Sequence, residues 1–230
     1  LDVSNNLGIG QHDIFIKKMI NIWNYVILGD KSKALMHLDS FSHENKLNPE
    51  ILYYLQVQGL VISSYFNDSK EINHRYNILK KDILKIPNRH YIDFSKVVYQ
   101  KVDKQEAKEI LIKNLPKNLD LNLSIQKLED NEKLEIQYFL AKIFFEAGYI
   151  VARSKGLLNS IPFFWYSLHI DKNNDQSKLI LASFFSNVDQ IDISLDILSE
   201  KTIKSPSWII IEFEKSYLYE QKGKINLAIS

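Results

Sequence analysis

The six histidines are the residues whose side chains could do chemistry most directly, since an imidazole can bind a metal ion or move a proton near neutral pH. None of them stands in an H-E-x-x-H motif or at another spacing typical of metal ligands. They are scattered along the chain as His12, His37, His43, His74, His90 and His169. We therefore expect surface or ordinary structural roles for them, and no metal site.

The motifs of nucleotide and acyl-transfer chemistry are also missing from the sequence. There is no G-x-S-x-G elbow, P-loop or G-x-G-x-x-G, and Gly8-Ile9-Gly10 is too short a match to the last of these. The acidic residues 129–132 lack the spacing and the turn glycine of an EF-hand. Because the chain has no cysteine, thiolate zinc sites, iron–sulfur clusters and cysteine nucleophiles are excluded. The sequence predicts no catalytic residue and no cofactor, and we expect the chain not to be an enzyme.

Composition narrows the classes of partner. With 45% hydrophobic and 25% charged residues, the chain has the balance of an ordinary folded, soluble protein. The formal net charge of +1 gives no overall field that would attract nucleic acid or an anionic membrane. No run approaches the roughly 18 consecutive apolar residues of a membrane span. We expect neither nucleic acid as partner nor a membrane span, and the compartment stays open between cytoplasm and periplasm.

The elements that must position any binding residues are helices. Apolar residues recur at helical spacing from Ile14 to Leu28, and Gly29-Asp30 then ends the first helix. At Asn48-Pro49-Glu50 an asparagine can cap a helix, proline suits its first turn and glutamate complements its dipole. Further helices are predicted over residues 51–65, 70–83, 89–102 and 104–115. With short polar links between them, the predicted unit is a helical hairpin in an all-α chain.

Small residues repeat in the C-terminal half of the chain. Gly148, Ala182 and Ser216 are separated by steps of 34 residues. The same step relates another set of small residues, Ser160, Ser194 and Ala228, and a set of large ones, Val151, Phe185 and Tyr219. Where two helices cross, only a small side chain lets the backbones approach closely, while large neighbours fill the remaining space.

These columns resemble the tetratricopeptide repeat (TPR), whose units place small, large and small residues at fixed positions. The arrangement is also similar to that of bacterial TPR proteins. The resemblance implies a right-handed superhelical solenoid of antiparallel helix hairpins, forming one domain over residues 1–230. The approximate repeats are 15–48, 52–85, 88–121, 141–174, 175–208 and a truncated 209–230, with an insertion at 122–140 that we expect to be part loop and part lengthened first helix. Since the chain begins without Met and stops inside an expected helix, we take it to be part of a longer protein.

The resemblance also implies which residues line a concave groove formed by the first helices of successive hairpins. The predicted groove residues are Lys142, Phe145, Tyr149, Arg153, Gln176, Leu179, Ser183, Phe213, Tyr217 and Gln221. Among them Phe145, Tyr149, Phe213 and Tyr217 are expected to be anchors, because aromatic rings offer large contact area at low entropic cost. Lys142 and Arg153 would add polar specificity. The alternative is that these rings merely complete the core of a tightly wound superhelix.

The function implied by the resemblance is that of a protein–protein interaction scaffold, which binds a peptide or helix of another protein. Self-association stays open, since the four aromatic residues 163–166 cannot all point into one core. A second hypothesis makes the chain the helical regulatory or substrate-recruiting part of a longer enzyme, such as a TPR-fused transferase.

Overall fold

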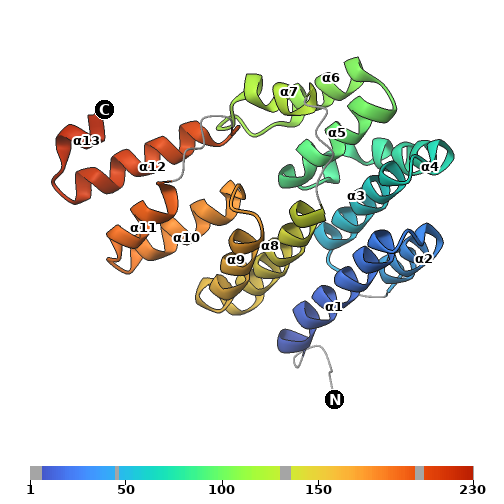
Figure 1. Ribbon diagram of the computed structural model, residues 1–230, viewed down its shortest axis with the longest axis horizontal. Coiled ribbons are helices and arrows are strands. Elements are labelled where there is room, and N and C mark those ends of the chain that lie inside the picture. The colour runs from blue at the N-terminus through green and yellow to red at the C-terminus, as the bar shows by residue number, and fades with distance from the viewer. Residues whose placement is uncertain (1–6, 45–46, 130–135, 200–204, 230) are drawn as a thin grey trace. The chain divides into compact units, whose positions relative to one another are not determined.

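The computed structural model describes residues 7–44, 47–129, 136–199 and 205–229, with side chains from residue 12 to residue 228 (Figure 1). Within these ranges the regular elements are thirteen α-helices and two short 3-10 turns, and no strand is present. The predicted all-α class is therefore confirmed for the described part of the chain.

The chain divides into two compact units. The central unit comprises Asn21–Glu132, and the terminal unit combines Leu1–Ile20 with Lys133–Ser230. The boundary falls inside the first helix, so that α1 contributes residues to both units. The expectation of one continuous solenoid stays a prediction, and each unit is described by itself below.

The central unit is built from the C-terminal end of α1 and six further helices. Their bounds are α1 Leu7–Ile27, α2 Lys31–Ser42, α3 Pro49–Tyr65, α4 Ser69–Lys81, η2 Ile83–Lys85, η3 Asn88–His90, α5 Tyr91–Lys101, α6 Lys104–Asn114 and α7 Leu121–Glu129. The four helices predicted between residues 51 and 115 correspond to α3, α4, α5 and α6, whose ends differ from the prediction by no more than two residues.

Side-chain caps explain where the helices of the central unit begin. Asn48 accepts a hydrogen bond from the backbone N–H of Glu50 at 2.9 Å, and Pro49 stands in the first turn of α3, as the sequence predicts. Asp30, Asp68 and Asp103 cap α2, α4 and α6 in the same way. Each cap satisfies an N–H group that has no partner within its helix.

Helix α7 was not anticipated, because the insertion 122–140 was expected to be partly loop and partly a lengthened first helix. The Asp120 carboxylate accepts a hydrogen bond from the N–H of Leu123 at 3.0 Å, which caps a short helix there. Ser124 and Leu128 are buried on it, and α7 packs against α5 and α6. The lengthened helix is also present, since α8 begins at Ile136. Residues 130–135 lie outside the described residues, and with them most of the acidic stretch 129–132.

The terminal unit contains three consecutive helix pairs in addition to the N-terminal part of α1. The bounds are α8 Ile136–Lys155, α9 Leu157–Ile170, α10 Asp175–Asn187, α11 Ile191–Leu198, α12 Trp208–Gln221 and α13 Ile225–Ile229. The members of each pair pack against each other, α9 packs against α10, and α11 packs against α12 (Figure 1). Each helix of this series therefore lies against its neighbours in the chain.

The repeating small residues mark the crossing points of these three pairs. A Cβ atom added at Gly148 would lie 2.9 Å from Cε1 of Phe164, so α8 and α9 could not approach as closely with any other residue there. In the second pair the Ser194 hydroxyl donates to the carbonyl oxygen of Ala182 at 2.8 Å. Ser216 and Ala228 line one cavity between α12 and α13.

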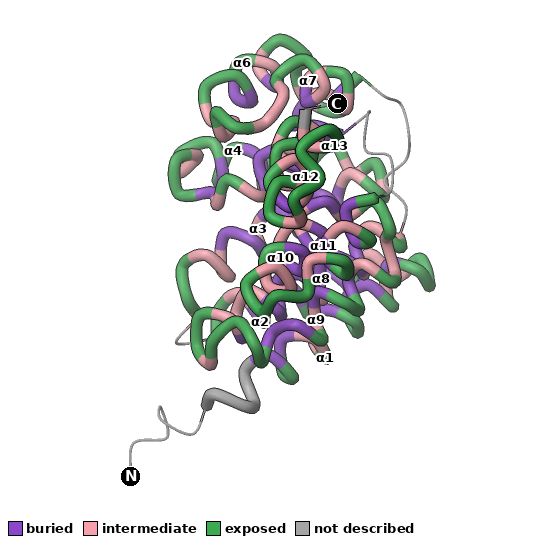
Figure 2. Tube along the Cα trace, turned by 90° about the vertical axis from the view of Figure 1, so that its left-hand side faces the viewer, coloured by how far each residue is buried: buried purple, intermediate pink, exposed green. Residues whose placement is uncertain are grey.

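The core of the terminal unit runs through all three pairs. Its buried members are Phe145, Ile161, Phe164, Leu181, Ala182, Ile197, Leu198, Ile211 and Leu218. The core thins toward the chain end, because α12 buries only Ile211 and Leu218. Figure 2 shows much of α12 and α13 in the colour of exposed residues. Among the described residues, α12 therefore buries fewer side chains than α8, α9, α10 or α11.

Candidate functional site

Two predicted groove residues in the middle of α8 are buried. Lys142 is 8% exposed and Phe145 is 4% exposed. The ring of Phe145 lies 5.6 Å from that of Phe164, within the core of the terminal unit. Phe145 consequently offers no surface to a partner in this structure.

The C-terminal end of α8 is more accessible. Tyr149 is half-buried and Arg153 is exposed. The guanidinium carbon of Arg153 lies 5.9 Å from the centre of the Tyr149 ring, at the distance of a cation–π contact. These two predicted groove residues form a small polar-aromatic surface of their own.

The predicted groove residues on α10 contribute little apolar surface. Gln176 is half-buried, Leu179 packs against the core of the unit, and Ser183 is exposed but small. Helix α10 therefore supplies no anchor.

Among the predicted groove residues, the most exposed aromatic side chains lie on α12. The side chains of Phe213 and Tyr217 are 72% and 50% exposed, although both are large and apolar. They stand four residues apart, on one side of the helix. Gln221, four residues further on, is also exposed. Contiguous apolar exposure of this kind marks contact surfaces more often than isolated exposed residues do.

A cavity lies beside these two rings, between α12 and α13. It is open at the surface, has a volume of about 350 Å³ and is lined by Phe213, Ser216, Tyr217, Glu220, Ile225 and Ala228. We call these six residues the α12–α13 pocket. The small side chains of Ser216 and Ala228 leave the space, and the larger residues form its walls.

Sequence reasoning missed Glu220 and Ile225 as members of this pocket. Glu220 lies seven residues after Phe213 and so returns to the same side of α12. Ile225 is the first residue of α13, after a turn in which Gly223 has a φ of +68°. Helical spacing could have pointed to Glu220, whereas the position of Ile225 depends on the turn.

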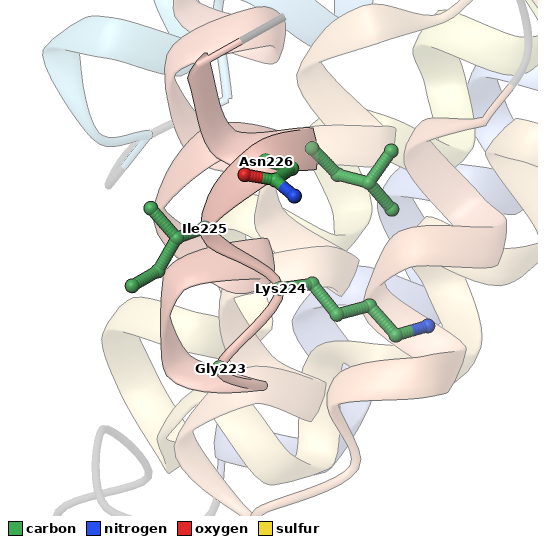
Figure 3. A pocket seen from close by; sticks show the side chains of 5 residues that line it. Gly223, Lys224, Ile225 and Asn226 are labelled. Carbon is green, nitrogen blue, oxygen red and sulfur yellow. The ribbon is translucent and has the colours of Figure 1, made fainter.

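The turn itself carries a second, shallower cavity of about 300 Å³, lined by residues 223–227. Figure 3 shows the side chains of Ile225 and Lys224 on opposite sides of the backbone. The Lys224 ammonium therefore points away from the wall that Ile225 contributes to the α12–α13 pocket.

The charges near the α12–α13 pocket leave one carboxylate unpaired. Lys215 bonds to Glu212 at 2.9 Å, and Lys222 bonds to Asp192 of α11. The hydrogen bond from Lys222 holds the pKa of Asp192 below its ordinary value. Among the residues that the structure describes, no cation pairs with Glu220. The pocket thus combines aromatic walls with a free negative charge.

Within the described ranges, no three histidine, aspartate or glutamate side chains come together in a way that could hold a metal ion. None of the described helices combines the length and apolar character needed to cross a membrane.

No protein-family model matches the chain, and no curated protein is significantly similar to it. Inference about function therefore depends on the residues and their geometry.

Proposed function

We propose that this chain is a TPR-like solenoid of antiparallel helix hairpins that acts as a protein–protein interaction scaffold. What supports the architecture is the register of small residues, since Gly148, Ala182 and Ser216 each stand at the crossing of a packed helix pair. Units of this kind nest because the small side chains let helix backbones approach.

The partner binds on the side formed by the first helices of the pairs, and α12 supplies the anchors. The single observation that carries this proposal is the pair of exposed rings, Phe213 and Tyr217, beside a cavity of about 350 Å³. Tyr149 and Arg153 extend the surface with an aromatic and a cationic group. Lys142 and Phe145 are buried and support helix α8, which carries Tyr149 and Arg153.

A peptide or helix of another protein suits this surface better than a small molecule does. The α12–α13 pocket is at the small end of ligand sites and is open at the surface, so it can take one or two side chains but cannot enclose a cofactor. Aromatic anchors next to such a pocket are typical of the few residues that provide most of the binding energy at an interface.

The experiment is a selection of binding peptides from a displayed library, followed by measured affinity for the purified chain. Phe213→Ala combined with Tyr217→Ala should weaken the selected peptides at least about tenfold, because truncating a hot-spot residue costs on the order of 2 kcal/mol. Circular dichroism would confirm that the variant remains folded.

Leu158→Ala is the matched control, since Leu158 is 71% exposed on α9, as exposed as Phe213 on α12. That variant should bind the peptides like the wild type. Unchanged affinity of the Phe213/Tyr217 double variant, or an equal loss in both variants, would show that α12 is not the binding surface.

A further inference from the structure

Helix α9, which packs against α8 and α10, has an exposed face without charge (Figure 1). None of its fourteen residues is Asp, Glu, Lys or Arg. One side of the helix is buried in the core, and the other side exposes Leu158, Pro162, Trp165 and Tyr166. We call these four residues the α9 face, since helical spacing places them on one side. A helix that is apolar all round is normally buried all round, so the α9 face has the character of a covered surface.

The two exposed rings of the α9 face are held in place by rings of the neighbouring helices. The Trp165 ring lies 6.0 Å from that of Phe185 on α10, and the Tyr166 ring lies 5.6 Å from that of Phe144 on α8. Both supporting rings are half-buried, whereas Trp165 and Tyr166 are 40% and 58% exposed. Because the exposed rings are already oriented, little side-chain entropy is lost when a partner covers them.

The absence of charge suits an identical partner. Two copies that meet about a two-fold axis bring each charge near that axis against its own counterpart, which repels it. The α9 face has no such charge, and the amide of the bordering Asn159 already donates to the carbonyl oxygen of Lys155 at 2.7 Å. His169 lies seven residues after Pro162, about 10 Å further along the helix. Interfaces between identical subunits are likewise poor in charge and rich in aromatic residues.

The order of residues along α9 is also self-complementary. Leu158 stands four positions before Pro162, and Tyr166 stands four positions after it. If two antiparallel α9 helices cross at Pro162, Leu158 of each copy lies opposite the Tyr166 ring of the other, as a two-fold contact requires. The compact proline ring allows a close crossing, and antiparallel helix dipoles attract each other.

We propose that two copies of the chain associate through the α9 face, with their α9 helices antiparallel and crossing at Pro162. This surface is separate from the α12–α13 pocket, and the proposal does not rest on the proposed function. The four side chains expose roughly 400 Å² per copy, within the range of surface patches that mark interaction sites. Two such faces with their bordering rings make an interface at the small end, below about 1,200 Å² in total. The dimer is therefore weak and reversible, with a dissociation constant on the order of 10–100 µM.

Sedimentation velocity of the 230-residue chain, from about 1 µM to about 500 µM, brackets this dissociation constant. Pro162→Glu places two carboxylates against each other at the crossing and should raise the dissociation constant at least about tenfold. Pro162 lies inside α9, where glutamate is the better helix former, so the variant should stay folded. Circular dichroism checks the fold.

A mixture of two variants tests the two-fold crossing itself. Pro162→Lys should be as monomeric as Pro162→Glu, because each variant repels its own copy. An equimolar mixture of the two should associate more tightly than either variant alone, since opposite charges then meet at the crossing. Met36→Glu is the matched control, because Met36 is 59% exposed on α2, as exposed as Tyr166 on α9. That control should dimerise like the wild type.

Other outcomes overturn the proposal in distinguishable ways. A wild-type chain that stays monomeric over the whole concentration range has no such interface. A dimer that persists in Pro162→Glu, or one that is lost when Phe213 and Tyr217 are both replaced by alanine, forms through another surface. A mixture that remains monomeric excludes the crossing at Pro162. If the monomer instead binds phosphatidylcholine vesicles and Pro162→Glu does not, the α9 face belongs to a lipid surface.

Discussion

The size of single side chains decides how closely the helix pairs pack. Gly148 is buried where α8 crosses α9, and a Cβ atom there would lie 2.9 Å from one ring carbon of Phe164 and 3.1 Å from Cβ of Phe163. Phe164 is only 1% exposed, so its ring has little room to move. At this position the helix backbone needs a glycine for space and not for its conformational freedom.

Gly148→Ala should therefore destabilise the chain, although alanine is the better helix former. Overpacking a core costs typically 1–3 kcal/mol, and the gain in helix propensity is about 1 kcal/mol, so we expect a net loss of about 1 kcal/mol. Urea unfolding measures it. Ser183→Ala, on the exposed side of α10, gains propensity without overpacking and should be neutral or slightly stabilising. A more stable Gly148→Ala variant would contradict the close approach of α8 and α9.

At the scale of elements, polar side chains join helices α4 and α6 of the central unit. Tyr76 of α4 is 4% exposed, and Lys80 of the same helix pairs with Glu106 of α6. Burial raises the pKa of Tyr76 to about 12, with the nearby Glu106 carboxylate as a further cause. The hydrogen bond from Lys80 lowers the pKa of Glu106. The buried Tyr76 ring thus stays a neutral phenol beside the Lys80–Glu106 ion pair that joins the two helices.

This contact predicts how stability changes in alkaline solution. The folded state holds the Tyr76 proton up to about pH 12, whereas the unfolded chain releases it near the ordinary pKa of 10. The stabilisation is therefore complete below pH 10 and is lost as the pH rises toward 12. Tyr76→Phe should lose less stability than the wild type between pH 9 and about pH 11, measured by urea unfolding. Tyr65→Phe, on an exposed ring, should follow the wild-type curve. Parallel curves for Tyr76→Phe and wild type would contradict this account.

At the scale of the whole molecule, the chain forms two compact units, each with a core of its own. In the central unit α3 has ten buried residues, and its Leu60 has no exposed surface. In the terminal unit Leu181 of α10 is equally buried. Because each helix contacts mainly its neighbours in the chain, we expect local disturbances to spread within a unit first.

Leu60→Ala should cost about 2–5 kcal/mol and act mainly on the central unit. Hydrogen exchange followed by mass spectrometry should show faster exchange over residues 21–129 and a smaller change over residues 136–229. Leu181→Ala should give the opposite distribution. If either substitution accelerates exchange equally in both units, the two units unfold as one cooperative body.

The sequence by itself determined where most helices begin and which residues let them cross. Caps such as Asn48 act on N–H groups two or three positions away, so local sequence is sufficient to predict them. Among the α-helices in the described part of the chain, α7 alone was missed, because the sequence of this short capped helix does not show that it packs against α5 and α6. The sequence predicted the groove residues as one group. Which of them are buried depends on residues that are distant in the chain and pack against them.

Phe145 and Phe213 show what only the tertiary structure decided. They are the same residue type and stand two steps of 34 residues apart, at equivalent positions of α8 and α12. Yet Phe145 is 4% exposed and Phe213 is 72% exposed. Phe145 has Phe164 and the core of three helix pairs against it, whereas the described residues beside Phe213 leave an open pocket. A residue's place in the repeat fixes the direction of its side chain, but the atoms packed against that side chain decide whether it becomes core or contact surface.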